Sequence, residues 1–415
     1  MPNLTVMVKP VSNSCNMRCK YCFYNDVSER RATHNTMSNS TAHNAMSNST
    51  YHSMMSNSTM EALVRKAMNY AGKECSFIFQ GGEPTLAGLG FYKEFVRLQR
   101  EYNRNNSFVI YYFQTNGYAL DREWADFFKA NGFIVGLSLD GVQPAHDKYR
   151  VDAGGQGTYG KAYEAAELLS KCGVRHDILC VVTDEVASRP AETYNALRKH
   201  RRMNFIPYIS PFAGRTPSDT APSDTAPSDV APAFAARAGE ECALDPAKYA
   251  GFLKTTFDLV CRDMDNNYSI SVRMFENYVA AIHGETPEQC GMDGVCKGYF
   301  LVEADGGVYP CDFYAADEWK LGDINANSFA RMADCDAMNH FIGISCQADE
   351  GCAGCNWHYL CNGGCRRYRE PAGGMVAPFS GGSLGKNIFC ESYKEFFEYS
   401  VERMKKIFLS EHIIY

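Results

Sequence analysis

Three cysteines near the start of the sequence constrain this chain more than any other feature. Cys15, Cys19 and Cys22 are spaced C-x3-C-x2-C, just after an apolar run, Leu4–Val8. Three thiolates cannot complete the four-thiolate shell usual for a [4Fe–4S] cluster, so one iron would stay open to a non-protein ligand. The alternative is a zinc knuckle or a chance grouping of cysteines.

Composition argues against several classes of protein. The 415 residues carry a net charge of −7 and no basic stripe, which argues against nucleic acid as the main partner. The sequence contains no run of about 18 apolar residues, so no membrane span is predicted. The cysteine motif begins too early to leave space for a signal peptide ahead of it. We therefore expect a cytoplasmic protein whose 18 cysteines hold metal rather than form disulfides.

Apolar runs alternate with stretches of helical period along the first half of the chain. The runs are Leu4–Val8, Ser76–Phe79, Phe108–Phe113, Ile134–Leu139, Asp177–Val182 and Phe205–Ile209. Helical stripes include Met60, Leu63, Val64, Ala67 and Met68, and later Trp124, Phe127 and Phe128, while Thr158 is a candidate cap for a third helix. The alternation predicts parallel strands with right-handed crossovers. In barrels of this kind the chemistry sits at the carboxyl ends of the strands.

Polar motifs follow the strands at those ends. The second strand runs into Gln80-Gly81-Gly82-Glu83-Pro84, where two glycines let the backbone approach a ligand closely and Glu83 supplies a carboxylate. The third and fourth strands end in Gln114-Thr115-Asn116-Gly117 and Ser138-Leu139-Asp140-Gly141. For each residue taken singly, ordinary turn or cap chemistry is the alternative.

The cysteine loop and the Gly-Gly-Glu-Pro motif together resemble the radical S-adenosylmethionine (SAM) enzymes. The resemblance implies a partial (β/α)6 barrel, with SAM chelated to the open iron and split into methionine and a 5′-deoxyadenosyl radical. It also implies that the Gly-Gly-Glu-Pro motif hydrogen-bonds the SAM amino group. On this basis the expected SAM-binding residues are Tyr21, Gly81, Gly82, Glu83, Ser138 and Arg150.

Changes in composition divide the chain into five predicted segments. Residues 1–215 form the barrel, and 31–57 are a mobile loop within it, because Met-Ser-Asn-Ser-Thr recurs there every nine residues and few of its residues could enter a core. Residues 216–245 are a low-complexity linker. Residues 246–284 are a helical bridge, 285–400 a cysteine-rich domain, and 401–415 a C-terminal helix and tail.

The cysteine-rich domain has regular spacing. Cys296 is followed by nine residues, Gly306, four residues and Cys311; then come Cys352-x2-Cys355-x5-Cys361-x3-Cys365 and finally Cys390. With Cys290 these are eight cysteines, the number that two clusters of four thiolates need. One or two zinc sites are the alternative.

This spacing resembles the SPASM extension of radical SAM enzymes, which carries two auxiliary [4Fe–4S] clusters. By that resemblance Cys290, Cys296, Cys311 and Cys365 hold the inner cluster. Cys352, Cys355, Cys361 and Cys390 hold the outer one. With the SAM-binding cluster, three clusters are expected.

Longer stretches resemble the anaerobic sulfatase-maturating enzymes within this group. They include Cys15–Tyr24, Phe79–Gly88, Gln114–Gly117, Tyr309–Tyr314, Gly363–Arg367 and Cys390–Tyr399. The implied reaction oxidises a Cys or Ser of a client sulfatase to Cα-formylglycine without O2, after the radical removes a hydrogen atom from the substrate Cβ. A second electron would leave through the inner auxiliary cluster. The sequence does not name the client or choose between Cys and Ser.

The resemblance also suggests roles for three residues near the expected barrel mouth. Asp312 directly follows the cluster ligand Cys311 and is the candidate base for the substrate proton, with a turn cap as its alternative role. Tyr24 and Gln80 are candidates for contact with the substrate peptide. A flavodoxin or ferredoxin is the usual electron donor in the family.

Two other functions stay open at this point. One is another SPASM peptide-modifying enzyme that forms thioether crosslinks or epimerises residues, although such enzymes often carry an N-terminal peptide-recognition domain. The other is a non-catalytic zinc or electron-transfer protein, which iron and sulfide content would identify.

Overall fold

The strands of the chain join into one curved sheet. The computed structural model describes residues 2–24, 27, 54–210, 243–370 and 375–407. In this part of the chain the sheet has ten strands in the order β10-β9-β8-β1-β2-β3-β4-β5-β6-β7. Strands β1 to β6 pair in parallel, each with the next. They are Leu4–Val8, Glu74–Phe79, Phe108–Thr115, Ile134–Ser138, His176–Val182 and Arg202–Pro207. The predicted α/β barrel fold is confirmed.

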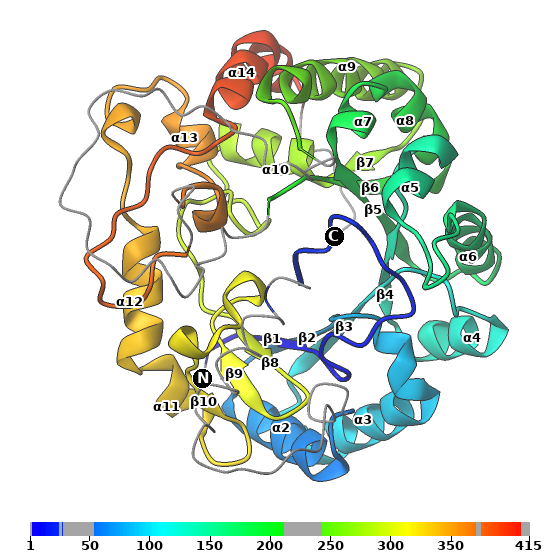
Figure 1. Ribbon diagram of the computed structural model, residues 1–415, viewed down its shortest axis with the longest axis vertical. Coiled ribbons are helices and arrows are strands. Elements are labelled where there is room, and N and C mark those ends of the chain that lie inside the picture. The colour runs from blue at the N-terminus through cyan, green and yellow to red at the C-terminus, as the bar shows by residue number, and fades with distance from the viewer. Residues whose placement is uncertain (1, 25–26, 28–53, 211–242, 371–374, 408–415) are drawn as a thin grey trace.

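Helices cover the outer face of this sheet (Figure 1). They are α2 (Asn57–Tyr70), α3 (Gly88–Tyr102), α4 (Arg122–Asn131), α5 (Gln143–Tyr149), α6 (Tyr159–Lys171), α7 (Asp184–Ala187), α8 (Pro190–Leu197) and α9 (Pro246–Asp265). Aromatic rings fill the space between the two layers; the Phe79 ring, for example, packs edge-on against Tyr92 and Phe95, with centroids 5.1 and 4.9 Å away. Burying this outer face leaves the concave face and the strand ends free to form a site.

The start of α2 corrects the expectation for the first repeat segment. Most of residues 31–57 lie outside the described residues, but the last repeat copy does not. Met55 is fully buried in the core. Ser56 caps the helix, because its hydroxyl accepts a hydrogen bond from the Thr59 amide at 3.1 Å. The expectation that the loop extends to residue 57 is therefore wrong at its end.

The second low-complexity segment shows a similar ordered end. Residues 216–242 lie outside the described residues, whereas Leu244 is buried in the core. Asp245 caps α9 by accepting from the amides of Ala247 and Lys248. The two helical stripes expected around Met60 and Trp124 are buried as predicted.

The predicted helical bridge, 246–284, contains a strand as well as helices. After α9, the short strand β7 (Ser271–Val272) pairs in parallel with β6, and α10 (Arg273–Ile282) follows. The α9 helix packs against α8 and against a helix near the C-terminus, α14 (Cys390–Met404). The bridge is thus part of the barrel wall, which apolar periodicity alone could not show for a strand of two residues.

The cysteine-rich region extends the same sheet at its other edge. Strand β8 (Phe300–Val302) pairs in parallel with β1, and β9 (Gly307–Tyr309) and β10 (Gly322–Asp323) follow in antiparallel pairing. The helices of this region are α11 (Phe329–Ala333), α12 (Asp336–Ser345), α13 (His358–Cys361) and α14 (Cys390–Met404). The last helix begins well before the predicted boundary at residue 401. The five-segment division itself remains a prediction.

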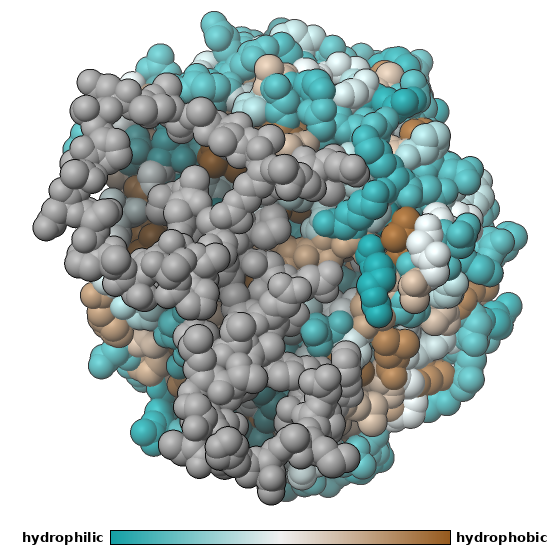
Figure 2. Space-filling view, in the orientation of Figure 1, coloured by the Kyte–Doolittle hydropathy of each residue, from teal (hydrophilic) through white to brown (hydrophobic). Residues whose placement is uncertain are grey.

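The visible surface of the outer helices is mostly hydrophilic, apart from the grey atoms, with a few apolar side chains scattered over it (Figure 2). Among the described residues no helix combines the length and the apolar character needed to cross a lipid bilayer.

Candidate active site

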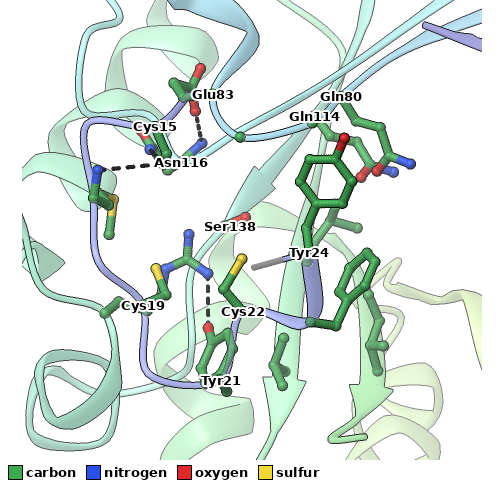
Figure 3. Close-up of a pocket in the computed structure, with 18 of the residues that line it drawn as sticks. Cys15, Cys19, Tyr21, Cys22, Tyr24, Gln80, Glu83, Gln114, Asn116 and Ser138 are labelled. Atoms are coloured by element: carbon green, nitrogen blue, oxygen red, sulfur yellow. Dashed lines mark hydrogen bonds between the residues drawn. The ribbon is translucent and has the colours of Figure 1, made fainter. Parts of the chain in front are cut away.

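The three cysteines of the N-terminal loop line a cavity of about 240 Å³ at the carboxyl ends of the strands. Figure 3 shows Cys15, Cys19 and Cys22 around this space. Burial raises the pKa of the Cys15 thiol to about 12. Burial also raises the pKa of Cys19, and the nearby Arg150 guanidinium opposes that rise. Thiols held this way favour a positively charged partner that would stabilise them as thiolates.

The Gly81-Gly82-Glu83 segment lies directly against the cysteine loop. The Gly82 amide donates to the Ser12 carbonyl and the Glu83 amide to the Ser14 carbonyl, both at 2.8 Å. A Cβ on Gly82 would lie 2.0 Å from the Ser14 carbonyl oxygen. The glycine therefore permits close approach to the loop that carries Cys15. From the sequence alone, these glycines were instead assigned to a close approach of the backbone to a ligand.

The Glu83 carboxylate is fully buried and already satisfied within the protein. It accepts from the Thr85 amide and hydroxyl at 3.0 and 2.7 Å, the Thr115 hydroxyl at 2.8 Å and the Asn116 amide at 2.8 Å. Burial raises its pKa, and these hydrogen bonds oppose the rise. Glu83 thus ties the ends of β2 and β3 together. A contact of this motif with SAM would have to come from its backbone.

A second polar network holds Arg150 at the opposite wall. The Arg150 guanidinium donates to the Tyr21 hydroxyl at 2.8 Å, and that hydroxyl donates to Asp140 at the end of β4. Asp140 also accepts from the Val181 amide of β5 at 2.8 Å. The Arg150 Nε atom is buried with no hydrogen-bond partner among the described residues. It has a hydrogen to donate to a ligand, and Ser138 lines the same cavity.

A buried histidine supports this network from behind. His146 Nδ1 accepts from the Asp140 amide at 3.2 Å, and its Nε2 lies 3.1 Å from the Thr158 hydroxyl. Because that hydroxyl donates to the Arg150 carbonyl at 2.9 Å, Nε2 must carry the hydrogen. The sequence suggested that the Thr158 side chain caps α6, but it makes no capping hydrogen bond. It links His146 to the backbone of Arg150 instead.

His146 predicts a particular loss of stability in acid. Burial, with Arg150 nearby, lowers its pKa from 6.5 to about 2. Below pH 6.5 the unfolded chain therefore binds a proton at this histidine, whereas the folded chain does not. The contribution of His146 to the free energy of unfolding is complete above pH 6.5 and is lost as the pH drops toward 2, by about 1.4 kcal/mol per pH unit. The His146→Gln variant keeps both hydrogen bonds without this charge. We expect its urea midpoint to fall less than that of the unaltered protein between about pH 7 and pH 5; equal falls would contradict the assignment.

Four of the eight C-terminal cysteines gather beside the barrel mouth. Burial raises the pKa of the Cys290 thiol, and the neighbouring Cys365 and Cys296 raise it further. Burial and then Cys296 raise the pKa of Cys365 to about 11. Cys311 has a raised pKa because of burial, followed by the charges of Asp312 and Cys290. Thiols affect one another in this way only when they lie close together.

The other four form a second group. Burial raises the pKa of Cys361 to about 11, and Cys390, Cys352 and Cys355 add to the rise. The division into an inner and an outer set of ligands, with Cys365 in the inner one, stays a prediction from the family resemblance. Among the described residues no three His, Cys, Asp or Glu side chains converge on the position of a single metal ion. In a [4Fe–4S] cluster the four thiolates surround a larger group.

Asp312 connects the C-terminal cysteines to the cavity of the N-terminal cysteine loop. It lines a second cavity of about 250 Å³ together with Cys290 and Cys365. One of its oxygens accepts from Gln80 Nε2 at 3.1 Å, and Gln80 also lines the cavity of the cysteine loop. Its other oxygen accepts from the Tyr299 hydroxyl at 3.1 Å and the Phe313 amide at 3.1 Å.

Tyr24 also faces the cavity, but its hydroxyl is committed to the protein. It donates to the fully buried Glu303, which also accepts from the Ser12 hydroxyl at 2.8 Å. The Lys9 ammonium lies 3.2 Å from the Tyr24 ring centroid. Sequence reasoning missed Lys9, Glu303 and Tyr299. A single Lys after a strand, or a Glu almost 300 residues away, gives no pattern to find.

Two family models match this chain where the site is built. The model of the radical SAM superfamily matches residues 10–197, and that of the SPASM iron–sulfur cluster-binding domain matches residues 290–356. The fold and the two cysteine regions define a radical SAM protein with a SPASM domain. A cysteine-type anaerobic sulfatase-maturating enzyme of Clostridium novyi is 36% identical over 97% of both chains. The chain belongs to the anaerobic sulfatase-maturating enzymes, and it is a radical SAM enzyme.

Two further relatives are informative. A solved structure of native anSMEcpe with bound AdoMet and Cp18Cys peptide has a TM-score of 0.81 and 34% identity, covering 97% of this chain and 98% of that one. A serine-type anaerobic sulfatase-maturating enzyme of Bacteroides thetaiotaomicron is 28% identical, covering 95% of this chain and 89% of that protein. The cofactors are SAM and iron–sulfur clusters, one in the radical SAM domain and the auxiliary ones in the SPASM domain.

Proposed function

We propose that this protein oxidises a cysteine of a client sulfatase to Cα-formylglycine. The observation that supports this most directly is the Gln80–Asp312 hydrogen bond of 3.1 Å. It joins the cavity of the three-cysteine loop to a carboxylate that directly follows Cys311. A substrate side chain placed there lies between a radical source and a proton acceptor.

The residues of this chain divide the work as follows. Cys15, Cys19 and Cys22 would hold the SAM-binding cluster, and Ser138 and Arg150 would bind SAM, the latter through its unpaired Nε. The Gly81–Glu83 backbone would complete the SAM site, and the ring of Tyr21 closes it. When bound, SAM and the clusters supply the radical that takes a Cβ hydrogen atom and the acceptor for one further electron.

The substrate proton needs an acceptor of its own, and Asp312 is placed to be that base. Gln80 donates to one carboxylate oxygen and so orients it, while the carboxylate still faces the cavity that contains Cys290. Tyr24, whose hydroxyl is bound to Glu303, can touch the substrate with its ring. The base then accepts the thiol proton as the carbon–sulfur double bond forms, and water hydrolyses the thioaldehyde to the aldehyde with release of hydrogen sulfide.

The preference for cysteine over serine rests on the relatives. The Clostridium novyi enzyme is described as cysteine-type at 36% identity, and the Bacteroides thetaiotaomicron enzyme as serine-type at 28%. We therefore propose a cysteine substrate. A flavodoxin or ferredoxin as electron donor and a cytoplasmic location belong to the same proposal.

The deciding experiment is anaerobic reconstitution with iron, sulfide, SAM and a reductant, followed by mass spectrometry of a sulfatase-derived cysteine peptide. Formylglycine has one sulfur and two hydrogens fewer than cysteine and one oxygen more. A product that has lost only two hydrogens would instead indicate a thioether crosslink or an unhydrolysed thioaldehyde. Added water or hydroxylamine distinguishes the two, because it reacts with the thioaldehyde and not with the thioether. A serine peptide run in parallel tests the cysteine preference.

A further inference from the structure

The hydroxyl of Tyr299 contacts two groups that the proposed function treats separately. Tyr299 immediately precedes β8, and its hydroxyl lies 3.2 Å from the Cys311 sulfur and 3.1 Å from a carboxylate oxygen of Asp312. The first is a proposed ligand of the inner auxiliary cluster, and the second is the proposed base. The one hydroxyl thus touches a proposed cluster ligand and the proposed base at the same time.

This hydroxyl acts as a donor to both neighbours. A phenol keeps its hydrogen at neutral pH, and both neighbours lie within hydrogen-bonding distance of this one. A carboxylate and a cluster-bound thiolate have no hydrogen to offer in return. One hydrogen therefore serves two acceptors.

The ring of Tyr299 has a separate structural task. It packs between two apolar clusters, one around Trp319 and Phe341 and the other around Met7 and Leu301. A phenylalanine at this position keeps that packing and removes only the hydroxyl. The hydroxyl can therefore be tested apart from the fold.

We propose that Tyr299 is a positioning residue that shares its hydroxyl hydrogen between Asp312 and the Cys311 sulfur. It thereby orients the base and raises the reduction potential of the cluster that Cys311 holds. Hydrogen bonds to cluster sulfurs favour the more electron-rich state, since they stabilise added negative charge. This inference rests on the proposed function, because it assigns Asp312 and Cys311 the roles given above.

The test is the Tyr299→Phe variant, reconstituted anaerobically and titrated with redox mediators while its clusters are followed by electron paramagnetic resonance. We expect unchanged iron content and a shift confined to one cluster. At a fixed potential its reduced-to-oxidised ratio should fall about tenfold, which is about 59 mV for one electron. Formylglycine formation should slow about tenfold, with the peptide KM little changed and more 5′-deoxyadenosine released per product.

Tyr194→Phe is the matched control. Tyr194 is also a buried tyrosine that donates to a carboxylate, Asp263, at 2.7 Å, but it lies on α8 and not beside the cluster ligands. It should shift no cluster. Unchanged potentials in Tyr299→Phe, or a general loss of iron, would overturn the inference. The titration needs no substrate, so if even the unaltered protein makes no formylglycine, the proposed function fails on its own and the potential shift is still measured.

Discussion

The Asp312→Asn variant should retain its clusters and its cleavage of SAM yet make formylglycine about 10²- to 10⁴-fold more slowly, the usual contribution of a general base. Asparagine has nearly the same shape, and its one acceptor oxygen can keep the bond from the Phe313 amide, while its NH2 group can bond Gln80 only if the Gln80 amide turns to present its oxygen. It cannot accept the substrate proton. Quantifying formylglycine and 5′-deoxyadenosine in the same reaction checks this.

The control for Asp312 is Asp317→Asn, an exposed carboxylate a few residues along the chain. It should leave both products unchanged. If Asp312→Asn formed formylglycine at the normal rate, the base would have to be another group. If SAM cleavage and formylglycine fell together, Asp312 would be needed for SAM binding or cluster assembly instead.

The sequence predicted those parts of the site that depend on local spacing. The C-x3-C-x2-C loop, the strand before Gln80 and the cysteine pattern from Cys296 onward each lie within one short segment. Their chemistry could therefore be read from the segment itself. The same holds for Asp312, which is adjacent to a patterned cysteine.

Several of the missed or misjudged features depend on partners far away in the chain. Glu83 was expected to face SAM, but its oxygens bind the end of β3, more than 30 residues later. Glu303 meets Ser12 and Tyr24 because β8 pairs with β1, a pairing that no spacing encodes. Tyr299 precedes the same strand. These contacts follow from sheet order, which a single sequence does not specify.

Sheet order also explains how the two cysteine regions come to share a site. The parallel pairing of β8 with β1 aligns Val8 with Val302, and the Lys9 amide continues it by donating to the Val302 carbonyl at 2.9 Å. The chain after β8 returns through β9 to Cys311. Because β9 is antiparallel to β8, the chain leaves β9 beside the start of β8, and the Gln80–Asp312 hydrogen bond of 3.1 Å connects this segment to the cavity of the cysteine loop.

Gly82→Ala should disable this arrangement from the other side of the cysteine loop. The new Cβ would lie 2.0 Å from the Ser14 carbonyl oxygen, whereas such contacts essentially never fall below 3.0 Å, so backbone must move by about 1 Å. Ser14 precedes Cys15, and the loop has no slack because the Gly82 and Glu83 amides hold it at 2.8 Å. A misplacement of about 1 Å can cost about 10²-fold in rate. We expect SAM cleavage to fall at least that far.

The control for Gly82 is Gly160→Ala, near the start of α6, where an added Cβ meets nothing within 4 Å. Alanine there should stabilise the helix by about 0.5–1 kcal/mol and leave SAM cleavage unchanged. Circular dichroism of both variants separates local displacement from unfolding. If Gly82→Ala cleaved SAM as fast as the unaltered protein, the cysteine loop would not depend on this contact. The position of Cys15 would then not be set by close packing of the Gly-Gly-Glu segment against the loop.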